Sequence, residues 1–241
     1  SSTGHLLIAE HWLGHRSDLF NIGIQAGAML AVMLIYRERI WDMTLGRRDA
    51  EQRDYLYKLA VAFLITCVGG LAAKKLGFEL PETLTPIAVA LIVGGVAILF
   101  VERIAARMPV SETLSWKVAI VVGAAQILAA VFPGTSRSAA TIFAAMLAGM
   151  TLRSKAADFA FLVGIPTMFA ATGYETLRLV GTPAFADEDW TAFAVGFVTS
   201  AIVAFIAVKW LLNYIQTHTF TIFAWYRIVF GAGLLLFAAQ T

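Results

Sequence analysis

A short polar stretch, PGTSRSAAT at 133–141, interrupts an otherwise apolar part of the sequence. Arg137 offers planar, bidentate donors to phosphate oxygens, and the hydroxyls of Ser136, Ser138 and Thr141 offer further donors. Free amides at the start of a following helix would complete a cradle for an anion. An arginine at the centre of a membrane helix costs about 2.5–3.5 kcal/mol, so one without a compensating partner is not expected. The stretch therefore predicts a phosphate clamp; the alternative is a structural arginine paired with a carbonyl or a carboxylate.

The sequence begins with another polar cluster, SSTGH, which contains Ser2, Thr3 and His5. Serine and threonine before a helix are most often caps, and a lone histidine is most often a hydrogen-bonded structural residue. The balance changes if this cluster lies beside the phosphate clamp. A histidine within reach of a serine and a bound phosphate could then act as general base, general acid or attacking group. Both interpretations of His5 stay open on the residues alone.

Membrane helices must position these clusters, because 59% of the residues are hydrophobic and only 14% are charged. The mean hydropathy of +0.77 is far above that of an ordinary globular domain. A helix needs about 20 apolar residues to cross the hydrocarbon layer. The stretches that meet this requirement are 20–36, 57–76, 84–103, 157–178, 191–213 and 219–239. The sequence thus predicts an all-α polytopic membrane protein with about six transmembrane helices.

Two further apolar stretches, 116–132 and 139–149, are shorter and are separated by PGTSRS. Proline removes an amide donor and glycine eases a sharp reversal, so Pro133 and Gly134 should end the first short helix. Ser136 or Ser138 can then cap the second. Non-helical backbone at membrane depth is tolerated only where protein or a water-filled cavity surrounds it. We therefore expect a re-entrant helical hairpin over 116–150.

The start of the chain looks like half of another such hairpin. Aligning Ser1 with Ser136 places Gly14 opposite Gly149, and a long apolar helix follows in both places. If the arginine-rich 37–58 loop is cytoplasmic, alternation puts most other loop Lys and Arg residues on the same side, as the positive-inside rule requires. The two hairpins then enter from opposite sides. We expect one membrane domain over 1–241, with inverted repeats at about 1–107 and 112–241 that meet at a midplane anion site.

Charge and cysteine content exclude two other features. The net charge of +2 is spread over loops and no nucleic-acid motif accompanies it, so a nucleic-acid partner is not expected. Cys67 is the single cysteine, so the chain forms no intramolecular disulfide. Of the carboxylates, Glu102 and Asp158 are expected at helix interfaces.

Four motifs together resemble a known family. They are SSTGH at the start, IQAGAMLAV at 24–32, PGTSRSAAT at 133–141 and FAWYR at 223–227. Over essentially all 241 residues the chain is similar to the bacterial undecaprenyl-diphosphate phosphatases of the bacitracin-resistance type. The resemblance implies a multi-pass enzyme of the bacterial plasma membrane that removes the terminal phosphate of undecaprenyl diphosphate and so recycles the lipid carrier for peptidoglycan synthesis. It also implies interlocked inverted repeats and a pocket that opens to the periplasmic side.

The resemblance assigns roles by motif position. Ser2 is the candidate nucleophile or phosphate-positioning hydroxyl, His5 is its acid/base partner or the alternative nucleophile, and Arg137 is the clamp. The residues assigned to binding the substrate phosphate are Thr3, Ser136, Ser138, Thr141, Gln25 and Gln126. For the two glutamines, an interhelical hydrogen bond is an equal alternative. The implied partners are an isoprenoid diphosphate and membrane lipids, with a homodimer left open.

The sequence departs from the family at its start. Family members begin with a further short re-entrant helix that carries an E/Q-x-x-x-E pair, followed by a proline before SST, and this sequence contains none of that. Such a pair on one helical face suits a divalent cation, Mg²⁺ or Ca²⁺, or proton transfer. The cation's ligands are therefore unknown here, and the alternative of an inactive fragment of an active parent stays open.

Two other functional classes compete with the phosphatase. A transporter or lipid flippase is the main alternative, because inverted repeats and midplane anion sites are equally a transporter design. The superfamily of lipid phosphatases with PSGH and SR-x5-H motifs requires a histidine six residues after the arginine. That position is Phe143 here, so this superfamily is discounted.

Overall fold

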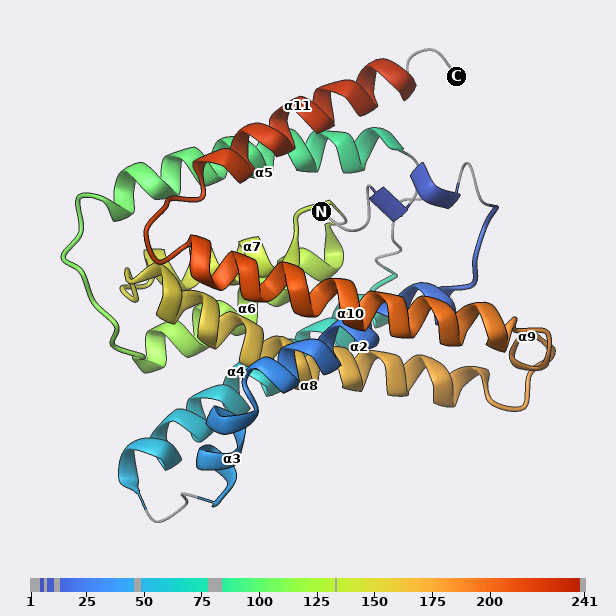
Figure 1. Cartoon of the computed structure of the whole chain (residues 1–241), viewed down its shortest axis with the longest axis horizontal. Helices are drawn as coiled ribbons and strands as arrows, with labels where there is room; N and C mark the ends of the chain where they lie inside the picture. Colours follow the sequence, from blue (N-terminus) through green and yellow to red (C-terminus); the bar gives the residue numbers. More distant parts are fainter. Residues whose placement is uncertain are drawn as a thin grey trace. The chain divides into compact units, whose positions relative to one another are not determined.

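The computed structural model describes residues 5–6, 8–10, 14–45, 49–77, 84–132 and 134–238. Within these ranges every regular element is an α-helix (Figure 1). Among the described residues, five helices are long and apolar enough to cross a membrane, and a sixth span results if the bent pair α2–α3 counts as one. The predicted all-α polytopic membrane fold is confirmed.

All six predicted spanning stretches form helices. They are α2 (Asp18–Ile35), α4 (Ala50–Lys75), α5 (Leu84–Ala105), α8 (Arg153–Leu179), α10 (Trp190–Tyr214) and α11 (Thr221–Ala238). The shorter helices are α3 (Arg37–Leu45), α6 (Trp116–Val131), α7 (Arg137–Leu147) and α9 (Pro183–Ala186). The predicted break between two short apolar helices is thus present between α6 and α7.

The interpretation of 37–58 as a loop was wrong. Residues 37–45 form α3, which is bent by 72° from α2, and α4 begins at Ala50. Charge alone suggested the loop, but Arg, Glu, Met and Leu are good helix formers and the stretch 37–45 contains neither proline nor glycine. In α3, Met43 is buried while Trp41 and Leu45 stay exposed, so this helix packs through one narrow face.

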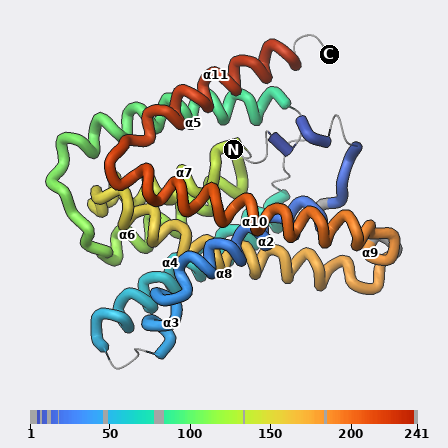
Figure 2. The backbone as a smooth tube through the Cα atoms, viewed as in Figure 1, coloured from blue at the N-terminus to red at the C-terminus, as the bar shows by residue number. Residues whose placement is uncertain are grey.

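The chain packs as two compact units, each assembled from early and late parts of the sequence (Figure 2). Unit 1 comprises 1–14, 58–160 and 215–241, and unit 2 comprises 15–57 and 161–214. In unit 2, α2 packs along α10. The Ser200 hydroxyl of α10 donates a hydrogen bond of 2.6 Å to the Ile24 carbonyl of α2, which satisfies this polar group between two apolar helices.

In unit 1, α5 and α11 lie side by side and antiparallel (Figure 1). Glycines set their closest approach. A Cβ added at Gly95 would lie 2.7 Å from the carbonyl oxygen of Ala224, and one added at Gly231 would lie 2.8 Å from that of Ala88. The same sequence offset separates Gly95 from Gly231 and Ala88 from Ala224. The contact is therefore reciprocal, as at an interface with a two-fold axis.

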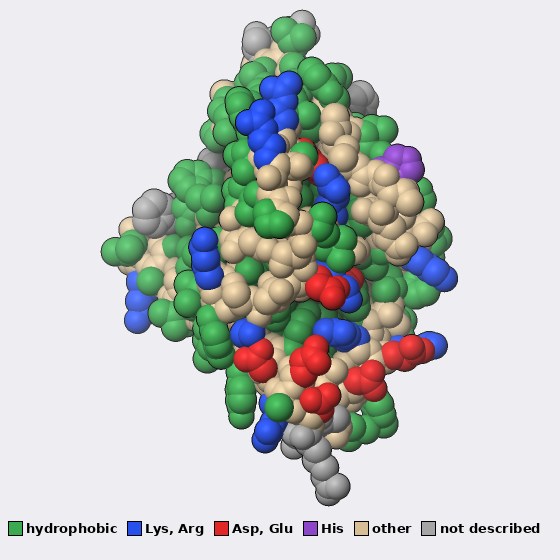
Figure 3. Space-filling model, turned by 90° about the vertical axis from the view of Figure 1, so that its left-hand side faces the viewer, with side chains coloured by type: hydrophobic (Ala, Val, Ile, Leu, Met, Phe, Trp, Pro, Cys, Tyr) green, Lys and Arg blue, Asp and Glu red, His purple; other side chains and the backbone are tan. Residues whose placement is uncertain are grey.

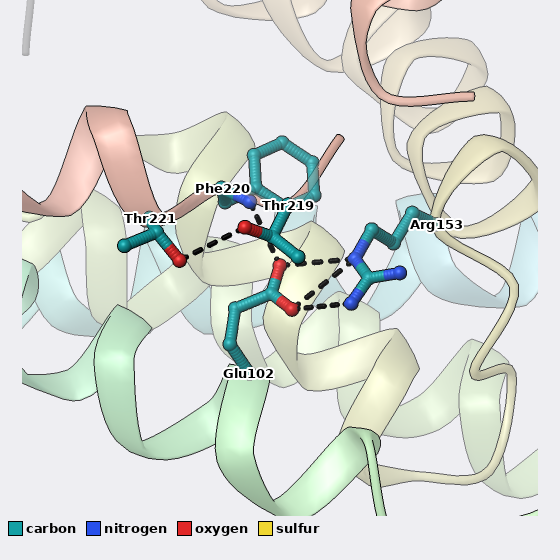
Figure 4. A network of polar contacts seen from close by, with 5 residues as sticks. All are labelled: Glu102, Arg153, Thr219, Phe220 and Thr221. Carbon is teal, nitrogen blue, oxygen red and sulfur yellow. Dashed lines mark hydrogen bonds and ion pairs between the residues drawn. The ribbon is translucent and has the colours of Figure 1, made fainter. Parts of the chain in front are cut away.

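A buried carboxylate joins the ends of three helices in unit 1 (Figure 4). Glu102 of α5, only 7% exposed, accepts a hydrogen bond of 3.0 Å from Nε of Arg153 at the start of α8. It also accepts one of 2.9 Å from the backbone amide of Phe220, directly before α11. The expected interface role of Glu102 is confirmed: its ion pair links α5 to the start of α8, and its hydrogen bond links α5 to the residue before α11.

Large apolar side chains remain on the surface of the helices. In α10, Val195, Val198, Ile202 and Ile206 are each more than half exposed, and none of the residues of this helix is buried. Figure 3 shows hydrophobic side chains over much of one face, with basic and acidic side chains between them. A water-soluble protein rarely exposes so much contiguous apolar surface, so lipid is the expected neighbour of these side chains.

Candidate active site

The polar turn between α6 and α7 presents the N-terminus of α7. Ser136 is the N-cap, and its hydroxyl accepts a hydrogen bond of 3.4 Å from the amide of Ala139. Its φ of 69° is the positive value of a non-glycine residue, and Gly134 has a φ of 92°. Such a backbone costs on the order of 1–3 kcal/mol at a residue with a side chain and persists only where the surroundings hold it. Pro133 lies outside the described residues.

The predicted clamp residues gather at the first turn of α7. Arg137 begins the helix and is half-buried, and the hydroxyl oxygens of Ser136 and Ser138 lie 3.4 Å apart. Backbone amides of a first helical turn have no carbonyl partner within their helix, and they carry a partial positive charge. The arrangement therefore combines a guanidinium, two hydroxyls and amides, which is a donor set for an anion.

Thr141 lies one turn further along α7 and is 1% exposed. Its hydroxyl donates to the carbonyl oxygens of Arg137 at 2.8 Å and Ser138 at 3.0 Å. The proton of this hydroxyl is thus directed to the backbone of the same turn. Thr141 stabilises the start of the helix in this geometry.

The turn is held from two sides within unit 1. Nη2 of Arg227, in α11, donates a hydrogen bond of 2.9 Å to the carbonyl oxygen of Gly134. A Cβ at Gly134 would lie 2.8 Å from the carbonyl oxygen of Ile87 in α5, so only glycine fits this close approach. The sequence indicated Arg227 only as the last residue of FAWYR, and its contact with the turn was missed.

The other predicted catalytic group also contacts α11. Nε2 of His5 lies 2.6 Å from the hydroxyl oxygen of Tyr226, and the His5 ring stacks on Phe230 with 4.4 Å between ring centroids. These contacts orient an otherwise exposed imidazole. Ser2 and Thr3 lie outside the described residues. Tyr226 was not among the predicted site residues, although FAWYR was one of the recognised motifs.

The two predicted glutamines make helix contacts. Gln126 of α6 is 1% exposed, and its amide donates a hydrogen bond of 2.9 Å to the hydroxyl of Thr66 in α4, which is the interhelical bond considered as the alternative. Gln25 belongs to unit 2, and its amide donates to the carbonyl of Asn21 in the same helix at 3.0 Å. The role of either in binding phosphate stays a prediction.

The donor set of the turn fits a phosphate and does not fit a divalent cation, which requires oxygen ligands of negative or partial negative charge. Among the residues that the structure describes, no three His, Cys, Asp or Glu side chains form a metal-binding group. The ligands for the Mg²⁺ or Ca²⁺ that the resemblance implies are thus not identified in the described part of the site.

Comparison with known proteins agrees with the resemblance that the sequence motifs indicate. The family model described as "Bacitracin resistance protein BacA" matches residues 1–233. An undecaprenyl-diphosphatase of Rhizobium etli (strain ATCC 51251) is 64% identical over 235 residues, covering 98% of this chain and 89% of the relative. Those of Rhizobium johnstonii and Xanthomonas oryzae pv. oryzae are 63% and 58% identical, covering 99% and 98% of this chain and 90% and 89% of the relatives. The comparisons give no support to the alternative of an inactive fragment.

Proposed function

Because the chain belongs to the BacA family, we propose that it hydrolyses undecaprenyl diphosphate to undecaprenyl phosphate and inorganic phosphate. This reaction recycles the lipid carrier for peptidoglycan synthesis and underlies resistance to bacitracin. The observation that carries the proposal is the identity of 64% to a protein named undecaprenyl-diphosphatase, over 98% of this chain. The protein is a multi-pass membrane hydrolase.

Arg137 is proposed to clamp the diphosphate at the N-terminus of α7. Phosphoryl transfer spreads charge over the oxygens of the terminal phosphate, so preorganised donors stabilise the transition state more than the ground state. The hydroxyls of Ser136 and Ser138, 3.4 Å apart, lie at the same helix start and supply further donors. Thr141, whose hydroxyl donates to the carbonyl of Arg137, also remains a candidate for binding the phosphate.

His5 and Ser2 are proposed as the groups that handle the attack. In the reaction a new bond forms to the terminal phosphorus while the bond from that phosphorus to the bridging oxygen breaks. Either Ser2 attacks and His5 accepts its proton, or His5 attacks directly. Undecaprenyl phosphate leaves with the bridging oxygen, and water then hydrolyses the phosphoenzyme to release inorganic phosphate. The hydrogen bond between the Tyr226 hydroxyl and Nε2 of His5 fixes the position of this ring nitrogen in both cases. Thr3, Gln25 and Gln126 remain candidates for binding the phosphate, and Mg²⁺ or Ca²⁺ remains the candidate cofactor.

We place the site in the bacterial plasma membrane with its pocket open to the periplasm, in one membrane domain of two inverted repeats at about 1–107 and 112–241. The reciprocal contact of α5 and α11 supports this arrangement. A two-fold axis that relates antiparallel spanning helices lies in the membrane plane, which is the symmetry of inverted-topology repeats. Loop charges support the orientation.

Release of inorganic phosphate tests the proposal. Purified protein in detergent should release phosphate from undecaprenyl diphosphate in the absence of any gradient, whereas a transporter or flippase would not. Parallel reactions with EDTA, Mg²⁺ and Ca²⁺ measure the cation requirement separately. A mock preparation from membranes without the expressed protein, purified in the same way, is the control for a contaminating phosphatase. No release above this control under any of the cation conditions would refute the proposed function.

A further inference from the structure

We propose that Arg227 is a positioning residue that holds the turn carrying Arg137 in its phosphate-binding conformation. The inference rests on the proposed function for its catalytic readout, but its structural basis is independent of the substrate. It starts from the packing of α11 on α5, where packing alone does not explain why the residue at position 227 is an arginine.

The reciprocal contact of the two helices extends beyond their glycines. A Cβ at Gly231 would lie 2.8 Å from Cγ1 of Ile92, and one at Gly95 would lie 2.7 Å from Cγ1 of Ile228. The next neighbours are Cβ of Leu91 at 3.1 Å and Cβ of Arg227 at 3.3 Å, respectively. Leu91 and Arg227 are thus equivalent positions of one symmetric contact. Since leucine satisfies the packing on one side, helix pairing does not require the arginine on the other.

The guanidinium of Arg227 is buried and bonded to carbonyl groups. The residue is 4% exposed, and Nη2 donates to the carbonyl oxygen of Ala90 at 3.2 Å as well as to that of Gly134 at 2.9 Å. Nε is buried with no hydrogen-bond partner among the described residues. Gly94 leaves the space for this group, because a side chain there would collide with Nη2. A buried cation held only by dipoles is unfavourable for stability, so its retention points to another requirement.

That requirement is the shape of the turn. Gly134 precedes Ser136 and Arg137 by two and three residues, and both Gly134 and Ser136 have positive φ. A strained turn keeps one conformation only when several contacts determine it. The bond from Arg227 fixes the carbonyl of Gly134 and thereby the direction in which the chain enters α7. Without it, the first-turn amides and Arg137 lose their fixed position toward the phosphate.

The preceding residue of α11 supports the same interpretation. Tyr226 contacts His5 while Arg227 contacts Gly134, so two consecutive residues of one helix hold both predicted parts of the site. A misplacement of about 1 Å at an active site can reduce the rate about 100-fold. Arg227 therefore contributes to catalysis through position, without touching the substrate itself.

The decisive variant is Arg227→Leu, because leucine is the residue at the equivalent position 91. We expect kcat to fall about 10- to 100-fold, with a melting temperature equal to or above that of the wild type because an incompletely bonded buried charge is removed. Arg227→Lys, with one donor group in place of the fork, should recover part of the rate. Leu234→Ala, in the same α5–α11 core, is the matched control: it should lower the melting temperature and leave kcat of the folded protein unchanged.

A double-variant cycle separates positioning from general damage. Because Arg227 acts through the turn, adding Arg227→Leu to Arg137→Ala should lower kcat by no more than about threefold. Binding of inorganic pyrophosphate, measured by calorimetry, should weaken at least tenfold in Arg227→Leu. Wild-type kcat and pyrophosphate affinity in Arg227→Leu, or a full multiplicative loss in the double variant, would overturn the inference. If the wild type binds pyrophosphate but releases no phosphate, the proposed function is refuted. The pyrophosphate affinity of Arg227→Leu then still tests this inference.

Discussion

Nε2 of His5 lies 2.6 Å from the hydroxyl oxygen of Tyr226, although 221 residues separate the two in the sequence. The hydrogen bond and the stacking of the imidazole on Phe230 fix the ring of a residue that is otherwise exposed. A histidine that transfers a proton or attacks phosphorus must be held in one orientation. The contact is therefore the first place to test whether His5 is catalytic.

Tyr226→Phe removes the hydroxyl and keeps the aromatic ring. We expect kcat to fall about tenfold, the equivalent of one hydrogen bond, with little change in melting temperature. Rates of phosphate release and melting temperatures, measured side by side for the variant and the wild type, check this expectation. An unchanged rate would indicate that His5 has a structural role only.

Arg137→Lys keeps the positive charge and loses the planar fork. We expect it to lose most activity, and Arg137→Ala to lose about 100-fold or more, the effect of removing one transition-state donor. Both variants should fold, since Arg137→Lys adds no charge and Arg137→Ala removes one, and neither change hinders insertion. Phosphate release in detergent is measured beside thermal unfolding. If Arg137→Ala unfolds while its remaining folded fraction turns over at the wild-type rate, the prediction that Arg137 clamps the phosphate is wrong.

Gly95→Ala and Gly231→Ala should destabilise the protein to a similar extent, because the two contacts are reciprocal. Each methyl group would press on a carbonyl oxygen of the opposite helix, and such overpacking typically costs about 1–3 kcal/mol. Gly233→Ala is the matched control, since nothing lies within 4 Å of a Cβ at that position of α11. Melting temperatures in detergent decide the comparison. Equal effects at 231 and 233 would contradict the reciprocal packing.

Glu102→Gln should lower the melting temperature and leave kcat of the folded fraction near the wild-type value. The substitution leaves the Arg153 guanidinium without its charge partner, and breaking a buried pair costs about 3 kcal/mol. The double variant with Arg153→Met should recover part of the loss, because no charge then remains unpaired. A lack of any recovery would show that the ion pair is not the source of the effect.

The orientation can be tested by labelling. In a Cys67→Ser background, a cysteine introduced at Asp187 should react with an impermeant thiol reagent from the periplasm, while one at Arg47 should react only after permeabilisation. The reason is the positive-inside rule, from which we propose a cytoplasmic placement of the arginine-rich segment near residue 47. The reverse pattern would overturn the proposed side of substrate entry.

Local patterns predicted most of the helices, because hydropathy and the Pro133–Gly134 pair act over a few residues. At 37–45 the charged residues led to the incorrect prediction of a loop, whereas good helix formers determine the structure there. The roles of Tyr226 and Arg227 depend on contacts with residues far away in the sequence, and no local pattern contains that information. Thr141 shows a further limit: a hydroxyl beside an arginine can serve a ligand or its own helix, and only the geometry reveals its bond to the carbonyl of Arg137.

The pairing of α5 with α11 and of α2 with α10 also bears on how the protein is made. In both pairs an early helix takes a partner from the end of the chain. At a synthesis rate of about 5–20 residues per second, α5 waits on the order of ten seconds after its own synthesis before α11 exists. During that interval the surface of α5 around Gly95, which later packs on α11, has no partner in the nascent chain. A ribosome stalled before α11 should therefore leave α5 accessible to membrane chaperones and quality-control proteases, and release of the last helix should end that access.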